Sequence, residues 1–530
     1  AALLDGGPVP RADGPARDPM PDVLALLGDK ATVAGLAPFE ISRADDAASL
    51  ASYRWLRRNV FVDEQGLFDH DDRDDFDDDP RTVVLLARDR SGVVLGGVRL
   101  HPAVPGGPDL GWWCGSRLAV YPESRNGASG LWRDSRSNSY RAVRTDAAYP
   151  VGPALVLAAC AYAEAAGVLR FEATVQAASE RMFRRLGWVT AAPVTVAGRP
   201  HAAMRWPVGR IASAAARSKS ALGALVGGLA GVAGFVGDDG VPVPGSDLVA
   251  ACDAIAGSMV ERDPEWAGWC AVLVNVNDLC AMGAVPVGLL DALGARDASF
   301  AARVLSGLRR GSAAWGVPVL GGHTQLGVPA ALSVTALGRV PGDSGGPVPG
   351  GGGRPGQEVR LTADLGGAWH PGYTGRQWDS TSFRSAAELR AMARCLAGGG
   401  AGGGQRGRPA AAKDVSMAGI AGTLGMLAEA SGCGAVLDVA RMPRPAAASM
   451  GDWLTCFPGF GLVTAADAGT PAPAAGPAVS SACGSLVAGA GVRLRWPDGV
   501  ETVVIDGAVT GLGTAGSPGS EMPLPGVDAS

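Results

Sequence analysis

Alternating apolar and polar positions divide the chain into short strands and helices. Two apolar runs, 83–87 and 93–100, flank a polar turn that contains glycine, which predicts a β-hairpin. The stretch 155–166 ends at a glycine and predicts a helix. Residues 171–175 predict a strand, and 179–186 predict a short amphipathic helix after it. This mixture favours an α/β or α+β chain.

The most informative apolar run is 274–277, which ends at Asp278 and is followed by a turn at Gly283 and Pro286. We interpret the run as a strand with the acid at its end. A carboxylate there is costly to bury unless it binds a metal, a ligand or a helix N-terminus. A similar order of strand, acid and helix recurs at Asp414. The run therefore marks a candidate binding site.

Segments rich in Gly, Pro and Ser separate the patterned regions and predict several domains. The apolar run 221–237 is shorter than the roughly 20 residues that a membrane span needs, so we predict a packed helix there. The predicted boundaries are a flexible N-terminus at 1–36, a domain at 37–208, a linker or connecting helix at 209–225, a domain at 226–340, a linker at 341–356, a domain at 357–512 with a flexible insert at 398–407, and a flexible tail at 513–530.

Composition and charge indicate a cytoplasmic protein. The net charge is −5 and no basic stripe occurs, so we expect neither nucleic-acid nor membrane binding. The nine cysteines include no CxxC pair and most have apolar neighbours, which is typical of a reducing compartment. No signal-peptide pattern is present. Lysine occurs only at Lys30, Lys219 and Lys413, so a lysine within a motif is notable.

Four motifs follow one another in the first domain, at 57–65, 115–122, 151–156 and 183–188. In this order they resemble the GNAT acyltransferase family over most of 37–208. The resemblance implies a mixed central sheet with helices, acetyl-CoA as cofactor and a small amine as acceptor. A strand that ends at 118–120 can offer backbone N–H groups to a thioester carbonyl, and the next loop can hold the pyrophosphate on free amides.

The candidate residues of this domain come from the resemblance. Segment 130–150 is interpreted as an insertion, so either of the glycines on its two sides can begin the helix. Phe183 stands where the family has a tyrosine general acid, and phenylalanine cannot donate a proton. No catalytic residue is therefore assigned, and the candidates are Glu64, Glu172 and, in the later region, His323. The predicted acetyl-CoA contacts are Leu118, Ala119, Val120, Arg125, Gly127, Gly152 and Ser179.

An acidic run at 69–79 contains eight aspartates. It lacks the glycine of an EF-hand loop, so calcium binding is not expected. Two interpretations remain open: a solvated acidic loop, or a funnel that attracts a cationic amine substrate.

A second ordered set of motifs lies at 237–239, 252–254, 277–286, 321–324 and 413–419. It resembles the aminoimidazole ribonucleotide (AIR) synthetase superfamily, which includes thiamine-phosphate kinase and selenophosphate synthetase. The resemblance implies a two-part α/β module that binds ATP with Mg²⁺ and transfers or splits a phosphate. It also implies a homodimer with ATP near the interface.

Each motif of this set has a chemical use. Mg²⁺ prefers oxygen ligands, and we predict Asp238, Asp239, Asp253 and Asp278. Paired glycines let the backbone approach phosphate closely. His323 stands where relatives have an acid, and Lys413 is either a phosphate contact or a surface lysine. For one aspartate in isolation a helix cap is the alternative. The predicted ATP contacts are Asp253, Asn277, Asp278, Gly321, Gly322, Thr324 and Lys413.

The string 342–348 matches the nucleophile signature of trypsin-like proteases. A catalytic serine needs a histidine base and a buried aspartate. None of the five histidines lies in such a context, so protease activity is excluded.

The two modules in this order resemble a bacterial fusion family associated with nitrilase gene clusters and nitrogen starvation. The resemblance implies a bifunctional enzyme that combines N-acetyl transfer to a small amine with ATP-dependent activation of a small nitrogenous metabolite. Nitrilase-cluster proteins are then candidate partners. Two alternatives stay open: an ATP-dependent enzyme whose first domain only binds substrate or CoA, and a non-catalytic metabolite-binding partner of a nitrilase.

Overall fold

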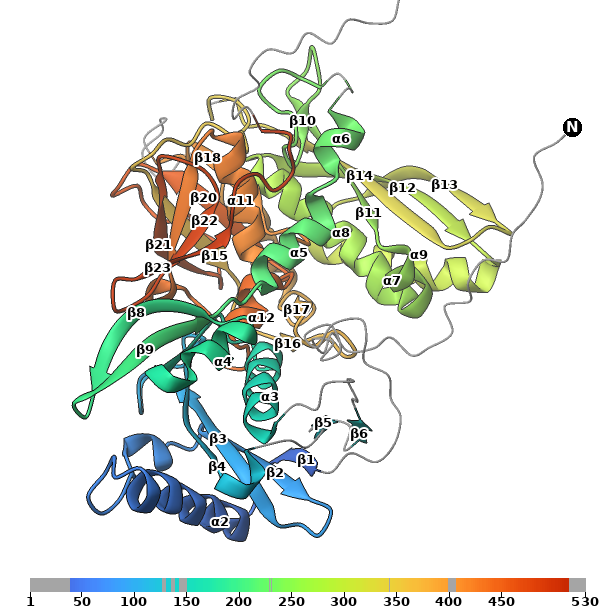
Figure 1. Cartoon of the computed structure of the whole chain (residues 1–530). Helices are drawn as coiled ribbons and strands as arrows, with labels where there is room; N and C mark the ends of the chain where they lie inside the picture. Colours follow the sequence, from blue (N-terminus) through green and yellow to red (C-terminus); the bar gives the residue numbers. More distant parts are fainter. Residues whose placement is uncertain are drawn as a thin grey trace, which may run out of the picture. The chain divides into compact units, whose positions relative to one another are not determined.

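The computed structural model places the chain in two compact units, Ala1–Val208 and Gly209–Ser530 (Figure 1). The predicted N-terminal segment 1–36, most of the insert 398–407 and the tail after 513 lie outside the described residues. The structure describes residues 39–125, 130–134, 139–142, 150–227, 229, 231–342, 344–398 and 407–513.

The N-terminal unit is built on one mixed sheet of nine strands in the order β6-β5-β1-β2-β3-β4-β7-β9-β8. The pairs β1–β5 and β4–β7 are parallel and the others antiparallel. The predicted hairpin, now β2 and β3, and the predicted strand β7 are confirmed. The strands are β1 (Phe39–Arg43), β2 (Val83–Asp89), β3 (Val94–Pro102), β4 (Trp112–Val120), β5 (Gly130–Asp134), β6 (Ser139–Ala142), β7 (Arg170–Gln176), β8 (Val189–Val196) and β9 (Arg199–Trp206).

Helices cover both faces of this sheet. Successive residues of β2 point to opposite faces of the sheet. Leu85 packs in a hydrophobic core with residues of α3, and Leu86 packs in a second hydrophobic core with residues of α2. Both faces are buried, which explains the continuous apolar run of β2. The predicted helix at 155–166 is confirmed as α3. The helical segments are α2 (Ala47–Arg57), η1 (Arg58–Glu64), η2 (Asp75–Asp77), η3 (Pro122–Ser124), α3 (Val151–Ala165), η4 (Ala177–Ser179) and α4 (Glu180–Arg185).

The aspartate-rich run 69–79 folds into an ion-pair network against the sheet. Arg57, which is fully buried, donates from Nε to Asp72 at 2.7 Å and from Nη2 to Asp77 at 2.9 Å. Arg99, also buried, donates to Asp74 at 2.8 Å. Asp79 is also buried and pairs with Arg81 at 2.6 Å. Four of the eight aspartates are therefore neutralised internally, and neither interpretation from the sequence, a solvated loop or an amine funnel, describes them.

The C-terminal unit contains two main sheets, a five-stranded sheet in the order β10-β11-β14-β12-β13 and a seven-stranded sheet in the order β18-β20-β15-β21-β19-β22-β23. The two short strands β16 and β17 form a separate hairpin. The strands are β10 (Val241–Pro242), β11 (Leu248–Ile255), β12 (Val285–Ala295), β13 (Val319–Leu326), β14 (Ala331–Arg339), β15 (Glu358–Ala363), β16 (Ala368–Trp369), β17 (Trp378–Asp379), β18 (Ala411–Asp414), β19 (Gly434–Asp438), β20 (Gly461–Ala466), β21 (Val479–Val487), β22 (Val492–Arg495) and β23 (Glu501–Ile505).

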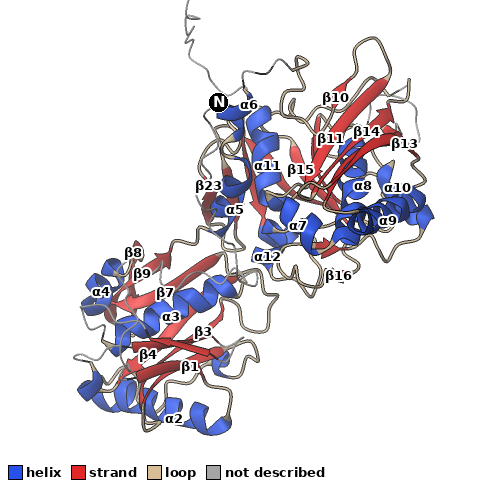
Figure 2. Cartoon of the chain, turned by 90° about the vertical axis from the view of Figure 1, so that its right-hand side faces the viewer, coloured by secondary structure: helices blue, strands red, loops and turns tan. Residues whose placement is uncertain are grey.

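Helices α8 and α9 pack against each other and against the five-stranded sheet (Figure 2). They approach closely because Gly268 and Gly307 lie at the crossing: a Cβ on Gly307 would lie 1.9 Å from the carbonyl oxygen of Glu265. The helical segments of this unit are α5 (Arg210–Lys219), α6 (Leu222–Val226), α7 (Gly257–Arg262), α8 (Pro264–Ala281), α9 (Ala298–Trp315), α10 (Ala386–Ala393), α11 (Gly419–Ala430), η5 (Val439–Arg441) and α12 (Met450–Thr455).

The run 274–278 is helical, so the prediction of a strand ending at Asp278 was wrong. Asp263 begins α8 by accepting a hydrogen bond from the N–H of Trp266, and Pro264 occupies the first turn. The helix is covered by β11, β14, α9 and β18. It is therefore apolar on all sides and lacks the 3.6-residue period that identifies a surface helix.

The segment predicted as a linker or connecting helix forms α5 and α6, and α5 packs on α11 and α12. The helix predicted over 221–237 is only partly confirmed, because α6 ends at Val226 and glycines follow. Among the described residues, no helix is both long enough and apolar enough to cross a bilayer.

Candidate functional site

Three carboxylates meet between the two sheets of the C-terminal unit. Asp239 precedes β10, Asp278 lies in the last turn of α8, and Asp414 ends β18. One oxygen from each lies within 4.8 Å of the other two. Asp278 and Asp414 are buried and Asp239 is half-buried. Hereafter these three residues are called the carboxylate cluster.

Burial and mutual repulsion control the protonation of the cluster. Desolvation, followed by the charges of Asp414, Asp253 and Asp239, raises the pKa of Asp278 well above its ordinary value. Desolvation and the charges of Asp239 and Asp253 do the same to Asp414. A side-chain contact with Asp414 further raises the pKa of Asp278. A divalent cation with a preference for oxygen fits this donor set, since it would offset the repulsion between three carboxylates whose oxygens lie this close.

A buried lysine organises the cluster. Lys413 is 2% exposed, and its Nζ lies 3.2 Å from Asp239 Oδ1 and 3.6 Å from Asp238 Oδ1. Its ammonium also donates to the carbonyl of Gly237 at 2.9 Å. The backbone N–H of Asp414 donates to the other oxygen of Asp239 at 2.8 Å. Lys413 is therefore an internal cation rather than a surface lysine.

Asp238, predicted as a metal ligand, lies outside the carboxylate cluster. Its carboxylate accepts from the N–H of Gly350 at 2.8 Å and faces Lys413. A Cβ on Gly350 would lie 2.3 Å from Asp238 Oδ1 and 2.6 Å from Lys413 Nζ. The segment 341–356, predicted only as a linker, thus supplies a glycine that the site requires.

Two other predicted residues surround the cluster. The charge of Asp253, on β11, acts on both Asp278 and Asp414, which places it nearby. Asn277 is buried and donates from Nδ2 to the carbonyl of Gly459 at 2.7 Å. This hydrogen bond ties α8 to the loop before β20, so the amide of Asn277 has a structural partner.

The motif at 321–324 lies on β13, the exposed edge strand of the five-stranded sheet, and not in the carboxylate cluster. Gly321, His323 and Thr324 are exposed there. A Cβ on Gly322 would lie 2.2 Å from Asp291 Oδ1 on β12. The close approach of this neighbouring strand therefore accounts for a glycine at position 322. Desolvation raises the pKa of Asp291.

Sequence reasoning did not assign Asp414 to the site, and it gave no signal for Asp291, which lies outside the carboxylate cluster. The order of strand, acid and helix at Asp414 was a usable signal, but the adjacent Lys413 was chosen as the contact. Asp291 lies within an apolar strand and carries no motif. Only the pairing of β12 with β13 brings it beside Gly322.

In the N-terminal unit, β4 and β7 pair only from Trp112–Gly115 to Arg170–Ala173 and then separate. A β-bulge interrupts the pairing of β4 with β3, and Arg117 adopts a φ of 52° there. The hydroxyl of Tyr53 donates to the Arg117 carbonyl at 2.7 Å and holds the bulge. The predicted segment 118–120 therefore has no β7 partner in its ladder.

Charged and polar pairs lie around the end of β4. Arg125 donates to both carboxylate oxygens of Glu64, at 2.7 and 2.6 Å, and to the carbonyl of Val120 at 3.1 Å. The Arg125 guanidinium lowers the pKa of Glu64. Gly152 is the second residue of α3, and a Cβ there would lie 3.8 Å from the side chain of Val120. Gly127 lies outside the described residues.

The other residues singled out in the N-terminal unit are Ser179, Glu172 and Phe183. Ser179 ends η4, just before α4. Glu172 accepts from Trp112 Nε1 at 3.0 Å and from Arg205 at 2.7 Å, within the part of the sheet where β4 and β7 are paired. Phe183 packs in the core with its ring 5.3 Å from that of Trp188.

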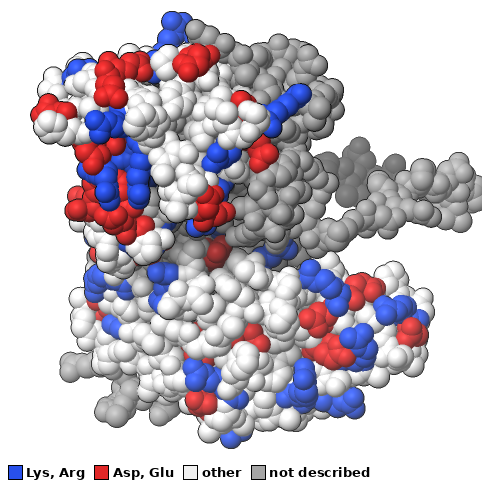
Figure 3. Space-filling view, turned by 90° about the horizontal axis from the view of Figure 1, so that it is seen from below, with Lys and Arg blue, Asp and Glu red and all other residues white. Residues whose placement is uncertain are grey.

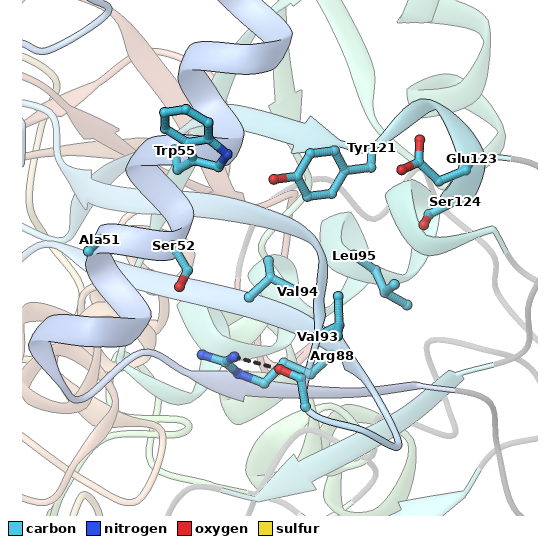
Figure 4. Close-up of a pocket in the computed structure, with 11 residues that line it drawn as sticks. Ala51, Ser52, Trp55, Arg88, Val93, Val94, Leu95, Tyr121, Glu123 and Ser124 are labelled. Atoms are coloured by element: carbon cyan, nitrogen blue, oxygen red, sulfur yellow. Dashed lines mark hydrogen bonds between the residues drawn. The ribbon is translucent and has the colours of Figure 1, made fainter.

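A separate cavity of about 720 Å³ opens between α2, the β2–β3 hairpin and η3 (Figure 4). Trp55 and Tyr121 lie across it from Arg88, whose guanidinium donates to Gly92 and Ser49 at 3.0 and 2.7 Å. No sequence signal marked it. Its lining residues are Ala51, Ser52, Trp55, Arg88, Gly92, Val93, Val94, Leu95, Tyr121, Glu123 and Ser124.

Surface charges of the two signs are interspersed on the face shown in Figure 3, where blue and red side chains lie side by side. Exposed pairs such as Arg303 with Glu265, at 2.6 Å, illustrate this local pairing.

Within the C-terminal unit, the fold and the site define a module with two main sheets that gathers three carboxylates and a buried lysine. A model of the AIR synthase related protein N-terminal domain matches residues 237–340, and a model of the corresponding C-terminal domain matches 379–468. Both matches lie in the C-terminal unit, and the chain belongs to this AIR synthase-related family.

The chain is also similar to individual proteins of other organisms. An uncharacterized protein of Synechocystis sp. is 34% identical over 242 residues, which cover 43% of this chain and 69% of that protein. Thiamine-monophosphate kinase of Synechococcus elongatus is 35% identical over 114 residues, which cover 20% of this chain and 35% of that enzyme. A solved thiamine-monophosphate kinase of Stenotrophomonas maltophilia is 25% identical, with coverage of 50% of this chain and 90% of that one and a TM-score of 0.37.

Proposed function

We propose that the C-terminal unit is an ATP-dependent enzyme that transfers the terminal phosphoryl group of Mg·ATP to a small metabolite. The observation that carries the proposal is the carboxylate cluster: three acids with oxygens within 4.8 Å, two of them buried, beside a buried lysine. Family membership supports it, as does the sequence similarity to a thiamine-monophosphate kinase.

The residues of the site have distinct roles in this proposal. Asp239, Asp278 and Asp414 would hold Mg²⁺, which when bound neutralises phosphate charge. Lys413 and the N–H of Asp414 fix Asp239 in place before the nucleotide arrives. Desolvation raises the pKa of Asp278 and of Asp414, and a bound cation would favour the ionised form of both acids. An acceptor oxygen then forms a bond to the terminal phosphorus while the bond to the leaving diphosphate oxygen breaks.

Isothermal titration with ATP and Mg²⁺ tests the proposal. We expect the whole chain to bind Mg·ATP, and Asp278→Asn and Asp414→Asn to lose that binding because each removes an anionic ligand. Asp506→Asn, at an exposed position outside the cluster, is the matched control and should bind normally. Normal Mg·ATP binding by both cluster variants would overturn the proposal.

A second activity is proposed for the N-terminal unit: transfer of an acyl group from acetyl-CoA to a small amine. The supporting observation is the separation of β4 from β7 at 118–120 behind a bulge at Arg117, which leaves strand amides available to a thioester carbonyl. The resemblance of the motifs to GNAT acyltransferases points in the same direction. Phe183 packs in the core and has no proton to donate, and Glu64 is held in an ion pair with Arg125. In this proposal the proton lost by the acceptor amine therefore passes to water and not to either side chain.

Mass spectrometry tests this second proposal. The whole chain is incubated with acetyl-CoA and a panel of small amines, with and without Mg·ATP, and products heavier by one acetyl group are sought. Leu118→Pro removes a backbone N–H at the proposed contact. Val189→Pro, on the exposed strand β8, is a control for proline in the same sheet. Equal acetylation by the Leu118 variant and wild type would contradict the proposed contact.

A homodimer is proposed for the C-terminal unit. All eight residues of the edge strand β13 are exposed, including Val319, Leu320 and Leu326. Leu290 on the adjacent strand β12 is also exposed. An exposed apolar edge of this kind is a template for pairing with another chain, and a second copy offers the same edge.

A further inference from the structure

Lysine is rare in this chain, with three among 46 lysines and arginines, yet two of the three act on one site. Lys413 is buried and already occupied by Asp239, Asp238 and the carbonyl of Gly237. Lys219 differs from it. In the part of the chain that the structure describes, the Lys219 ammonium has no close ion pair, and its side chain is half-buried.

Packing brings α5, which ends at Lys219, onto the elements that carry the carboxylate cluster. Ala215, one turn before Lys219, lies 3.5 Å from the Cβ position of Gly422 on α11, the helix that follows Asp414. Beyond Lys219, the N–H of Gly223 donates to the carbonyl of Thr510 at 2.7 Å. Leu512, two residues later, lies 3.3 Å from the Cβ position of Gly237. The chain is thus anchored beside the cluster on both sides of Lys219.

Lys219 is a charge beside the site that no carboxylate neutralises by direct contact. Its helix, α5, packs on α11, the helix that follows Asp414, and on α12. Among the described residues its ammonium forms no close ion pair. Desolvation raises the pKa of Asp253, and the charge of Lys219 opposes that shift.

We propose that Lys219 is a substrate-contacting residue that binds the terminal phosphate of Mg·ATP from α5, and this inference rests on the proposed function of the C-terminal unit. Mg·ATP keeps net negative charge at its phosphates, and a flexible ammonium that lacks a close partner can donate a charge-assisted hydrogen bond to a phosphate oxygen. Lys219 precedes both family-matched segments, 237–340 and 379–468, so the contact would be supplied by the helix that follows the N-terminal unit.

Titration calorimetry on the whole chain tests the inference, with Mg·ATP, Mg·ADP and adenosine as ligands. Lys219→Ala should weaken Mg·ATP binding by roughly 10-fold or more, the loss of one charge-assisted hydrogen bond. Adenosine binding should be unchanged, and Mg·ADP binding should change less than Mg·ATP binding. Lys219→Arg should restore much of the affinity. Arg217→Ala, which removes an exposed cation from the same helix, is the matched control and should bind all three ligands as wild type.

The outcomes separate this inference from the proposed function. If Lys219→Ala binds Mg·ATP as wild type does while Asp278→Asn does not, the inference is wrong and the ATP site stands. Equal weakening for adenosine and Mg·ATP would make Lys219 a structural residue and would also overturn the inference. Failure of wild type to bind Mg·ATP would reject the proposed function and the inference together.

Discussion

His101 is a buried imidazole that the fold keeps uncharged. Its Nδ1 donates to the carbonyl of Pro102 at 2.9 Å, and its Nε2 accepts from the hydroxyl of Ser116 at 3.1 Å. The ring stacks on Phe76 with centroids 3.8 Å apart. Desolvation lowers its pKa to about 4, and the charge of Arg99 acts in the same direction. Protonation therefore favours the unfolded state.

The stability of the N-terminal unit should fall as the pH falls from 6.5 to 4. The unfolded histidine gains a proton near pH 6.5 and the folded one only near pH 4, which amounts to roughly 3 kcal/mol across this window. Chemical denaturation at several pH values measures the slope. His101→Gln should flatten it, whereas His201→Gln, at a more exposed site, should keep it. An unchanged slope in the His101 variant would contradict this reasoning.

Gly350 should not tolerate a side chain. Gly350→Ala would place a Cβ against Asp238 and Lys413, and overpacking of this kind destabilises by roughly 1–3 kcal/mol. Denaturation and Mg·ATP titration should show a less stable C-terminal unit and weaker binding. Gly342→Ala, where nothing lies within 4 Å of the Cβ position, is the control and should be neutral. Equal stability of the two variants would contradict this prediction, because it would mean that Asp238 and Lys413 can move to make room for the alanine methyl group.

Individual residues of the site were partly predictable. Asp239, Asp278 and Lys413 were identified from motifs, but the sequence did not indicate which of the adjacent acids Asp238 and Asp239 faces the cluster. That choice depends on Gly350, which is 112 positions away in the chain. Asp414 was missed because its role depends on α8 packing against β18.

The edge strand β13 is the element on which the proposed dimer depends. Light scattering should give twice the mass of one chain for wild type. Leu326→Lys should weaken self-association by roughly 10-fold or more, because a charge at a sheet edge opposes pairing. Val503→Lys, at an equally exposed position on β23, should leave the dimer intact. A monomeric wild type would reject the proposed dimer.

The packing of η2 and its flanking loop depends on the buried arginines of the sheet. Arg99→Met would remove a cation that Asp74 and Asp77 share, and would leave Arg117 and Arg57 as their remaining partners. We expect a loss of roughly 1.5–3 kcal/mol, the contribution of a hydrogen bond to a charged group. Arg43→Met removes an exposed pair with Asp45 and should cost less than about 1 kcal/mol. Urea denaturation of the N-terminal unit compares the two. An effect at Arg99 as small as that at Arg43 would contradict this prediction, and would mean that Arg57 and Arg117 are sufficient for the two acids.

Whether a helix or strand was predicted correctly depended on how clearly its ends are marked and on how completely it is buried. The hairpin β2–β3 and helix α3 were found because glycines mark their ends. The helix α8 was mistaken for a strand because it is buried on all sides and rich in valine near its C-terminus. The ion-pair network was not predictable either, because it joins a loop at 72–77 to arginines on distant segments.

At the scale of the whole molecule, the chain combines two compact units, each with its own hydrophobic core residues. The chain divides into these units between Val208 and Gly209. The sequence did not indicate that the segment after the boundary packs on the C-terminal unit. Through α5 this segment brings Lys219 to the carboxylate cluster.

Because the two proposed ligands bind different units, each should stabilise its own unit. At a concentration of 100 times its Kd, a ligand stabilises the folded state by about 2.7 kcal/mol. Hydrogen exchange on the whole chain resolves this by segment: Mg·ATP should slow exchange in α8 and β18, and acetyl-CoA should slow it in β4 and α3. Asp278→Asn should abolish the first effect and leave the second intact. If Mg·ATP protected β4 and α3 as strongly as α8 and β18, the units would be energetically coupled and the assignment of one ligand to each would be wrong.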